Sequence, residues 1–434
     1  MKISIIGGGV GGLALAGLLD AARHDVTIFE KDSEAAFNGK YGWYDNINTN
    51  DLARLGFAHL IPRHLPEEED RVIVSPGKAN ALVFRINSPG AYEPVWRPKL
   101  LAQLKADALQ NAALHYGSPV QALLVENGAV KGVVTTEGEL RADLVVDCSG
   151  LSALSKPLLD ADGLRLNSSE FFVAYRAVYE HTSKKPAPFM DNIVLKHLGE
   201  TGVGWYNVDP DGNIDVLLGR IGQLRQTTID ESLRDMQAWA APWSALGACI
   251  QSNIYTIPVR YPLLQMVFDG YAALGDSAYM TIPMMGSGVV NALHAAKLLA
   301  KLLNKTDARR AATLWPYQTA YYKEAAPNAF AIDCLKRTAL GMPNDKLELL
   351  MGAGVLSGED IAAIFTGHFI PMTPAALLRK APGGVKIPLV VAELGATVAK
   401  ALAAEQVAKR IPQSYDPMRI AAWQQRLQGI MRSV

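Results

Sequence analysis

Apolar positions in the first thirty residues change from a strand-like spacing to a helix-like spacing and back. The β-branched residues Ile3, Ile5 and Ile6 form a short apolar run of the kind that fills a buried parallel strand. A helix-like apolar pattern follows over residues 10–22, and residues 25–29 return to a β-rich run. The chain therefore opens with a predicted strand, helix and second strand, an order typical of parallel α/β sheets.

The region up to residue 155 continues this mixed pattern. Two β-rich runs within residues 71–87, separated by a Pro-Gly-Lys turn, predict a hairpin. A proline near the first position and regularly spaced leucines predict a helix over residues 97–113. Further strands, separated by glycine-containing turns, are expected at residues 120–125, 130–135 and 144–147.

Near residue 167 the pattern changes to longer alternating runs, which predict an antiparallel sheet interrupted by a helix at 230–240. Residues 271–303 return to a strand followed by a helix, and the chain after Asn304 is predicted to be helical. The fold class expected is α/β, with a discontinuous organisation. We predict a Rossmann-like domain formed by 1–60, 95–155 and 265–304, a β-rich domain formed by 61–94 and 156–264, and a helical C-terminal region, 305–434.

The turn after the first strand carries glycines in a dinucleotide-binding spacing. Gly7, Gly9 and Gly12 match G-x-G-x-x-G, and Glu30 ends the second strand. These glycines permit a tight turn, a close approach of the backbone to a pyrophosphate, and close packing of the helix on the strand. The carboxylate is placed to accept hydrogen bonds from a ribose diol. The motif predicts a dinucleotide ligand and by itself leaves open whether that ligand is FAD or NAD(P).

A second glycine-rich stretch lies at residues 275–292, between a strand and a helix. Gly275 and Asp276 follow the strand, whereas Gly286 and Gly288 open the helix. An acid at that position suits the polyol chain of a flavin, and bare N–H groups at a helix start suit the polar edge of its ring system. The helix dipole there would stabilise the negative charge of a reduced flavin.

The composition narrows the classes of function. The 434 residues carry 42 basic and 42 acidic side chains, so no charge surplus indicates nucleic-acid binding. The three cysteines lie far apart, and neither they nor the eight histidines have metal-ligand spacing. No apolar run is long enough to span a membrane. We therefore expect a cytoplasmic protein without a metal.

Taken together, these motifs resemble those of the para-hydroxybenzoate hydroxylase-fold flavoproteins, and within them the geranylgeranyl reductase family. The resemblance rests on the glycine turn with Glu30, the strand at 144–150 with its Ser-Gly end, and the Gly-Asp…Pro…Gly-x-Gly block at 275–288. It extends to residues 39–43 and to an aromatic motif that begins at Gly204. The resemblance implies an FAD-binding domain, an antiparallel-sheet substrate domain and a helical C-terminal cap.

The candidate site residues follow from these motifs and from the resemblance, which places Arg97 against FAD. Neighbouring strand residues point to opposite faces, so at most one of Trp205 and Tyr206 is expected to line the pocket. No residue identifies itself as catalytic, and Tyr41, Tyr44 and Tyr206 are the candidate proton donors. The substrate-pocket candidates are Trp43, Trp205, Tyr206, Met284 and Met285. The cofactor-binding candidates are Gly7, Gly9, Gly11, Gly12, Glu30, Lys31, Gly42, Arg97, Val120, Gly275, Asp276, Gly286, Gly288, Val289 and Asn291.

Three functions stay open at this point. The first is an FAD-dependent reductase that transfers hydride to a C=C bond of an apolar or aromatic small molecule. Because only one dinucleotide turn exists, NAD(P)H would bind transiently or a protein carrier would deliver the electrons. The second is an NAD(P)H-dependent FAD monooxygenase that hydroxylates an aromatic substrate. The third is a flavoprotein electron carrier that docks at a membrane through the apolar segment 386–404.

Overall fold

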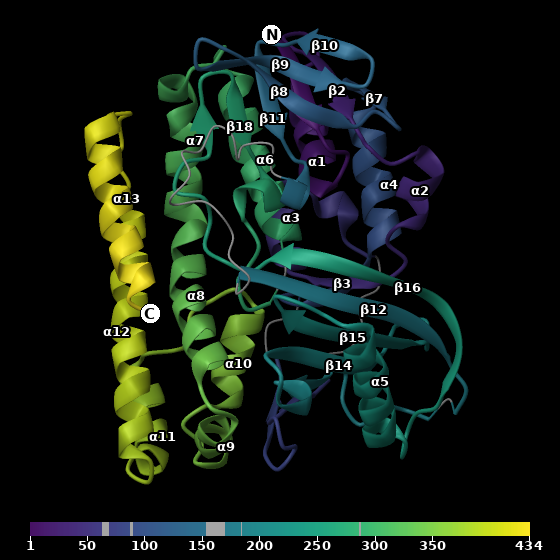
Figure 1. Cartoon of the computed structure of the whole chain (residues 1–434), viewed down its shortest axis with the longest axis vertical. Helices are drawn as coiled ribbons and strands as arrows, with labels where there is room; N and C mark the ends of the chain where they lie inside the picture. Colours follow the sequence, from purple (N-terminus) through teal and green to yellow (C-terminus); the bar gives the residue numbers. More distant parts are fainter. Residues whose placement is uncertain (63–68, 87–89, 153–169, 184, 286–287) are drawn as a thin grey trace.

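A computed structural model gives the fold of the chain (Figure 1). The N-terminal parallel sheet and its helices lie at one end of the molecule, and a large sheet, antiparallel except where β13 pairs with β4, lies at the other. The C-terminal helices run along one side of both parts. The structure describes residues 1–62, 69–86, 90–152, 170–183, 185–285 and 288–434.

The first sheet has six strands in the order β17-β18-β11-β1-β2-β7, all parallel except β17. Ile3 and Ile5 of β1 are fully buried, as the opening apolar run predicts. Helix α1 contacts both α4 and α6. The strands are β1 (Lys2–Ile6), β2 (Asp25–Phe29), β7 (Ala112–His115), β11 (Leu144–Asp147), β17 (Val267–Phe268) and β18 (Tyr271–Ala273), and the helices are α1 (Val10–Leu18), α4 (Arg97–Ala108) and α6 (Val289–Leu303).

Two elements of this half differ from the prediction. The helix expected over 97–113 ends at Ala108, because residues 112–115 pair with β2 as the edge strand of the sheet. The segment after residue 136, expected to be a turn, contains β10, which pairs with β9. Edge-strand pairing supplies backbone hydrogen bonds that local propensity does not reveal. The small antiparallel sheet is formed by β8 (Val120–Glu126), β9 (Ala129–Thr135) and β10 (Gly138–Arg141).

The second large sheet has seven strands in the order β16-β12-β15-β14-β13-β4-β5. The predicted hairpin is present as the antiparallel pair of β4 and β5. One face of the sheet packs against α5 (Gln226–Ala240), and the other faces the cavity described below. The strands are β4 (Arg71–Val74), β5 (Ala81–Phe84), β12 (Phe171–His181), β13 (Asn192–Leu195), β14 (Gly202–Val208), β15 (Ile214–Ile221) and β16 (Leu246–Pro258).

Short elements connect the two parts of the molecule. Strand β3 (Tyr44–Ile47) pairs with β6 (Glu93–Trp96), and α2 (Glu34–Gly39) and α3 (Thr49–Leu55) flank β3. The strands of the six-stranded sheet come from 1–60, 95–155 and 265–304, whereas those of the seven-stranded sheet come from 61–94 and 156–264. The bounds of the domains themselves stay a prediction.

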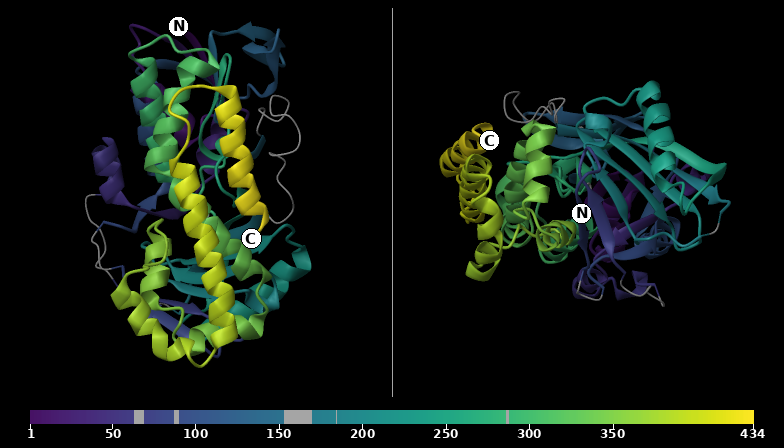
Figure 2. Two further views of the ribbon diagram at one scale, coloured as in Figure 1. Left: turned by 90° about the vertical axis from the view of Figure 1, so that its left-hand side faces the viewer. Right: turned by 90° about the horizontal axis from the view of Figure 1, so that it is seen from below.

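The C-terminal region is helical, as predicted. Helix α12 packs against α8 and α13, and α12 and α13 lie side by side (Figure 2). Within the described part of the chain, no helix is both long and apolar enough to pass through a lipid bilayer. The helices are α7 (Ala311–Glu324), α8 (Ala326–Gly341), α9 (Asn344–Gly352), α10 (Gly358–Phe365), α11 (Pro374–Gly384), α12 (Pro388–Lys409) and α13 (Pro417–Arg432).

Candidate cofactor and substrate site

The glycine turn between β1 and α1 forms an open cradle of backbone donors. Gly7 has φ of +98°, and a Cβ on Gly12 would lie 2.1 Å from the carbonyl oxygen of Gly7, so neither position accepts a side chain. Gly9 precedes α1, and none of the described side chains caps the first turn of this helix. A Cβ built on Gly9 would meet no described atom within 4 Å. The free N–H groups at the start of α1 therefore face open space that suits a phosphate.

The acid at the end of β2 lies beside this turn. Glu30 is only 6% exposed and lines the cavity. Its Oε2 accepts a hydrogen bond from Gly8 N at 2.8 Å, and its Oε1 accepts one from Asp32 N at 3.0 Å. Carboxylate oxygens have further lone pairs, so the group can also accept from the hydroxyls of a ribose. The neighbouring Lys31 is exposed and lines the same opening.

The second glycine-rich stretch lines another part of the same cavity. A short 3-10 turn, Gly275–Ala278, follows β18 and brings Asp276 to the cavity wall. Burial raises the pKa of Asp276, while the hydrogen bond that Thr281 Oγ1 donates at 2.7 Å opposes that shift. Helix α6 begins after Gly288, and no side chain among the described residues caps it, so its first N–H groups can meet an anionic or carbonyl edge.

Arg97 provides unused donors at the same cavity. It begins α4, and its Nη1 lies 3.0 Å from Asp45 Oδ2 without the alignment of a hydrogen bond. Its Nε and Nη1 atoms are buried and have no hydrogen-bond partner among the described residues. Buried donors without an acceptor are costly, so they fit a bound group with acceptor oxygens. The two free helix starts, Glu30, Asp276 and Arg97 together suit the phosphates, ribose and polyol of FAD.

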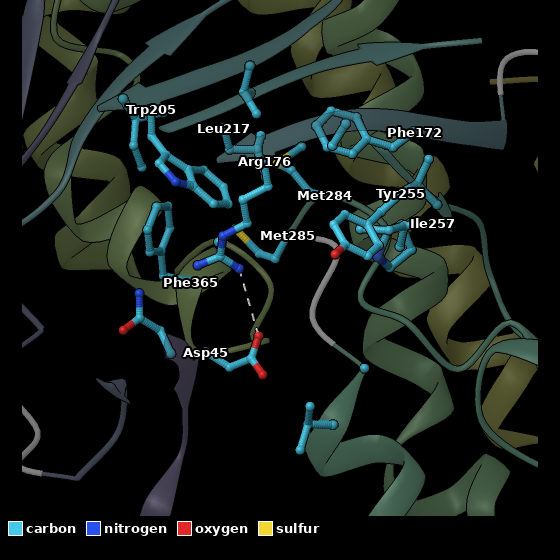
Figure 3. A pocket seen from close by; sticks show the side chains of 18 of the residues that line it. Asp45, Phe172, Arg176, Trp205, Leu217, Tyr255, Ile257, Met284, Met285 and Phe365 are labelled. Atoms are coloured by element: carbon cyan, nitrogen blue, oxygen red, sulfur yellow. Dashed lines mark ion pairs between the residues drawn. The ribbon is translucent and has the colours of Figure 1, made fainter. Parts of the chain in front are cut away.

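A cavity of about 1110 Å³ continues from this site into the space between the seven-stranded sheet and the C-terminal helices. Its far part is largely apolar, as Figure 3 shows. The alternation of the strands sends Phe172, Trp205 and Leu217 into it. Met284, Met285 and Phe365 of α10 also line the cavity, and Met285 packs against the apolar cluster that contains Phe365.

Two charged residues that the sequence analysis did not single out also lie in this part. Arg176 on β12 and Asp45 on β3 face each other in Figure 3, with Arg176 Nη1 4.0 Å from Asp45 Oδ1. Tyr255 on β16 completes an aromatic group with Tyr41 and Trp43. Arg176 could have been found from the sequence, because it is an arginine among the alternating apolar residues of a strand and lies on the same face as Phe172.

Tyr206 does not line the cavity. It is fully buried on the opposite face of the sheet, where its hydroxyl lies 3.1 Å from Ser244 Oγ and its ring contacts Trp243. The prediction that Tyr206 is a pocket residue or proton donor is therefore wrong, because Trp205 faces the cavity and its strand neighbour must point to the other face. Tyr44 reaches the cavity, but its hydroxyl donates to Asp211 Oδ2 at 3.1 Å. Burial, aided by Asp211, raises the pKa of Tyr44 to about 12.

The sequence-predicted residues other than Tyr206 and Gly286 divide into two groups. Those that line the cavity are Gly7, Gly9, Gly11, Glu30, Lys31, Arg97, Val120, Asp276, Gly288, Val289, Tyr41, Trp43, Tyr44, Trp205, Met284 and Met285. Four others are not part of its lining: Gly12, Gly42, Gly275 and Asn291. Gly42 packs against Gln251, and Asn291 Nδ2 donates to the carbonyl oxygen of Met280 at 2.7 Å, so both shape the surrounding loops. Gly286 lies outside the described residues.

Comparisons with known proteins extend this picture. A family model described as lycopene cyclase protein matches residues 2–168. The chain is 22% identical over 448 residues to a digeranylgeranylglycerophospholipid reductase from Sulfolobus acidocaldarius, covering 99% of this chain and 97% of that protein. A geranylgeranyl bacteriochlorophyll reductase-like structure from Thermoplasma acidophilum has a TM-score of 0.71 at 18% identity, covering 91% and 98% of the two chains. A probable FAD-dependent monooxygenase from Pseudomonas aeruginosa has a TM-score of 0.57 at 18% identity, covering 79% and 97%.

The fold and the site together define an FAD-dependent oxidoreductase of the architecture shared by flavin reductases and monooxygenases. Within this class, the chain is similar to geranylgeranyl reductases over nearly its whole length. The resemblance predicted from the glycine motifs is thereby confirmed, as is the predicted α/β fold with its antiparallel sheet and C-terminal helices.

Proposed function

We propose that this protein is a reductase that adds hydrogen across a C=C bond of an apolar or aromatic small molecule. When bound, FAD would supply the hydride to one carbon, and a protein or water acid would protonate the other. NAD(P)H or a protein carrier would replace the two electrons. The cofactor contacts are those that line the glycine turn, the end of β2 and the start of α6.

The observation that carries the proposal is the largely apolar cavity that continues beyond the cofactor site. Its far wall is formed by residues of α8, α9, α10 and α12, among them Leu335, Leu350, Ile361 and Leu394. Such a lining favours a hydrophobic ligand and excludes water from the reacting bond. The similarity to reductases named for geranylgeranyl substrates supports the same class of reaction.

Tyr41 is the proposed proton donor that fits the site best among the three tyrosines named from the sequence. It lines the cavity, and its ring contacts Trp43 edge-on with a centroid distance of 5.3 Å. The Arg97 guanidinium lies 5.0 Å from the ring centroid. Tyr206 is excluded by its place in the core, and the hydroxyl of Tyr44 is already directed to Asp211.

Anaerobic reoxidation of the reduced holoenzyme tests the proposal. The protein would be reduced with dithionite in the absence of oxygen and mixed with unsaturated lipids, quinones and unsaturated acids while the flavin absorbance is followed. We expect at least one apolar alkene to accelerate reoxidation and to yield the saturated product by mass spectrometry. Reoxidation at the buffer rate with every compound would contradict the proposal.

The second candidate function, an aromatic monooxygenase, is supported by the similarity to a probable FAD-dependent monooxygenase. Oxygen consumption separates it from the reductase. A monooxygenase consumes NAD(P)H and oxygen together and yields a hydroxylated product, whereas the proposed reductase yields a saturated product without oxygen.

Peripheral contact with a membrane is the third candidate and has its own observation. Leu378 at 74%, Val385 at 80% and Leu389 at 80% are exposed where α11 meets α12, and Lys386 lies among them. Lys380 and Leu394 of the same helices line the cavity, so an apolar ligand held at a bilayer surface would lie near its far end. Sedimentation with anionic liposomes tests this contact, and loss of binding in Leu378→Glu with Leu389→Glu is expected. The cytoplasmic location stays a prediction.

A further inference from the structure

Arg176 is a largely but not fully buried cation in the mostly apolar part of the cavity. Its side chain is 12% exposed and points from β12 toward the space between Trp205 and Asp45 (Figure 3). Taking a guanidinium out of water is costly unless its donors are paired. The contacts of each nitrogen therefore show what the side chain can still bind.

Two of its three nitrogens are already used. Nε and Nη2 donate to the carboxylate of Asp215 at 3.1 and 2.7 Å, and Nη2 also donates to the carbonyl oxygen of Tyr44 at 2.8 Å. The third nitrogen, Nη1, lies 4.0 Å from Asp45 Oδ1, beyond hydrogen-bond distance. Among the described residues it has no hydrogen-bond acceptor, so its two N–H groups are available to a ligand.

Aromatic rings hold the guanidinium in place. Its central carbon lies 4.8 Å from the Trp43 ring centroid and 5.5 Å from that of Trp205. Trp43 is itself fixed, because its Nε1 donates to Asp45 Oδ1 at 3.1 Å. Trp205 Nε1, in contrast, is buried without a hydrogen-bond partner in the described part of the chain. The cavity thus contains two neighbouring side chains with unused N–H donors.

The charges around these donors balance. The two guanidinium groups of Arg97 and Arg176 face the two carboxylates of Asp45 and Asp215, and each of the four is at most 20% exposed. An anionic ligand would lose its hydration here without a net positive charge to compensate for the loss. A neutral acceptor oxygen loses less on desolvation and still satisfies both unused donors.

We propose that Arg176 Nη1 and Trp205 Nε1 form a binding site for the carbonyl oxygen of a neutral, otherwise apolar ligand, such as an aldehyde, ketone or ester. The inference rests on the proposed function only in taking this cavity as the substrate site. It narrows the substrate class from apolar or aromatic small molecules in general to apolar carbonyl compounds. Where the carbonyl is conjugated to the C=C bond, the two donors withdraw electron density from that bond and favour hydride addition.

Binding of three ligands with one carbon skeleton tests the proposal: farnesal, farnesene and farnesoate. Each is titrated into the oxidised holoenzyme, and the dissociation constant is read from the change in flavin absorbance. We expect farnesal to bind at least about 10-fold more tightly than farnesene, because a hydrogen bond to a charged donor contributes that much to affinity. Equal binding of farnesal and farnesene, or tighter binding of farnesoate than of farnesal, would overturn the proposal.

Two variants assign the preference to its donors. Arg176→Lys keeps a cation beside Asp215 but removes Nη1, and Trp205→Phe removes Nε1 while leaving an aromatic ring against the guanidinium. Each should reduce the preference for farnesal over farnesene to about 3-fold or less. Arg85→Lys, at an exposed ion pair with Asp70, is the matched control and should retain the full preference. If both cavity variants still preferred farnesal over farnesene as wild type does, Arg176 Nη1 and Trp205 Nε1 would not be the donors to the carbonyl oxygen.

These measurements need no hydride transfer, so their outcome is separate from that of the proposed function. A preference for farnesal without reoxidation of the reduced enzyme would support the carbonyl site and contradict the reductase. Alkene reduction without any preference for farnesal would support the reductase and contradict the carbonyl site.

Discussion

The carboxylate of Glu30 accepts a hydrogen bond from the backbone N–H of Gly8 at 2.8 Å. This bond joins the end of β2 to the glycine turn that follows β1, so the acid is held beside the cradle before any ligand binds. Its second oxygen accepts from Asp32 N, which fixes the orientation of the carboxylate. A ribose placed here meets a preorganised acceptor and loses little free energy in ordering it.

Replacing this acid should weaken FAD binding more than it weakens the fold. In Glu30→Gln, an NH2 donor replaces one acceptor oxygen, and the negative charge that strengthens the hydrogen bonds to a ribose is lost. We therefore expect FAD affinity to fall about 10- to 100-fold. The measurement is titration of the apoprotein with FAD. Glu34→Gln is the control, since Glu34 is exposed and pairs with Lys105 outside the cavity lining, and its FAD affinity should match wild type. Equal affinity in both variants would contradict the role given to Glu30.

Alanine should affect stability at one glycine of the turn and FAD binding at another. A Cβ on Gly12 would lie 2.1 Å from the carbonyl oxygen of Gly7, so Gly12→Ala should lower the melting temperature of the apoprotein. A Cβ on Gly9 meets no described atom within 4 Å, so Gly9→Ala should leave that temperature within about 2 °C of wild type. The methyl group would nevertheless occupy the space that faces a pyrophosphate. We expect Gly9→Ala to weaken FAD binding at least 10-fold, and normal FAD affinity in this variant would place the cofactor elsewhere.

Features that depend on neighbouring residues could be predicted from the sequence, whereas features that depend on residues far apart along the chain could not. Local steric and helix-start signals mark the glycine turn, Glu30 and the stretch around Asp276. Each part of the cofactor site could therefore be predicted from one short segment of sequence. Arg176 and Asp45 lie 131 positions apart along the chain and meet only because β12 and β3 border the same cavity. No local pattern encodes that meeting. The edge strand β7 was missed for a related reason, since its hydrogen bonds come from β2.

Strand alternation was sufficient to separate Trp205 from Tyr206, but not to say which of them faces the cavity. That choice depends on which face of the sheet α5 covers, and the alternation within β14 carries no information about where the helix after β15 will pack. The aromatic character of both residues was therefore a poor guide to function.

Tyr206→Phe should leave catalysis unchanged and reduce stability slightly. The substitution removes one buried hydroxyl, whose contact with Ser244 Oγ contributes about 1 kcal/mol to the free energy of unfolding. Urea unfolding measures the loss of stability. Steady-state rates with any active substrate test whether catalysis is unchanged. Tyr41→Phe is the comparison, because Tyr41 lines the cavity and is the proposed proton donor. A fall in kcat for Tyr206→Phe without one for Tyr41→Phe would reverse the assignment.

His197 should make the protein less stable in mild acid. It is fully buried, and its Nε2 lies 2.5 Å from Asp235 Oδ2. Burial lowers the pKa of His197 most strongly, with Arg220 and Lys78 acting in the same direction and Asp235 opposing them. The unfolded chain then takes up a proton near pH 6.5 while the folded chain does not, so stability is full above that pH and falls below it. The melting temperature at saturating FAD should drop more from pH 7.5 to 5.5 in wild type than in His197→Gln, whereas His59→Gln, at an exposed histidine, should behave as wild type. An equal drop in wild type and His197→Gln would show that other groups account for the acid sensitivity.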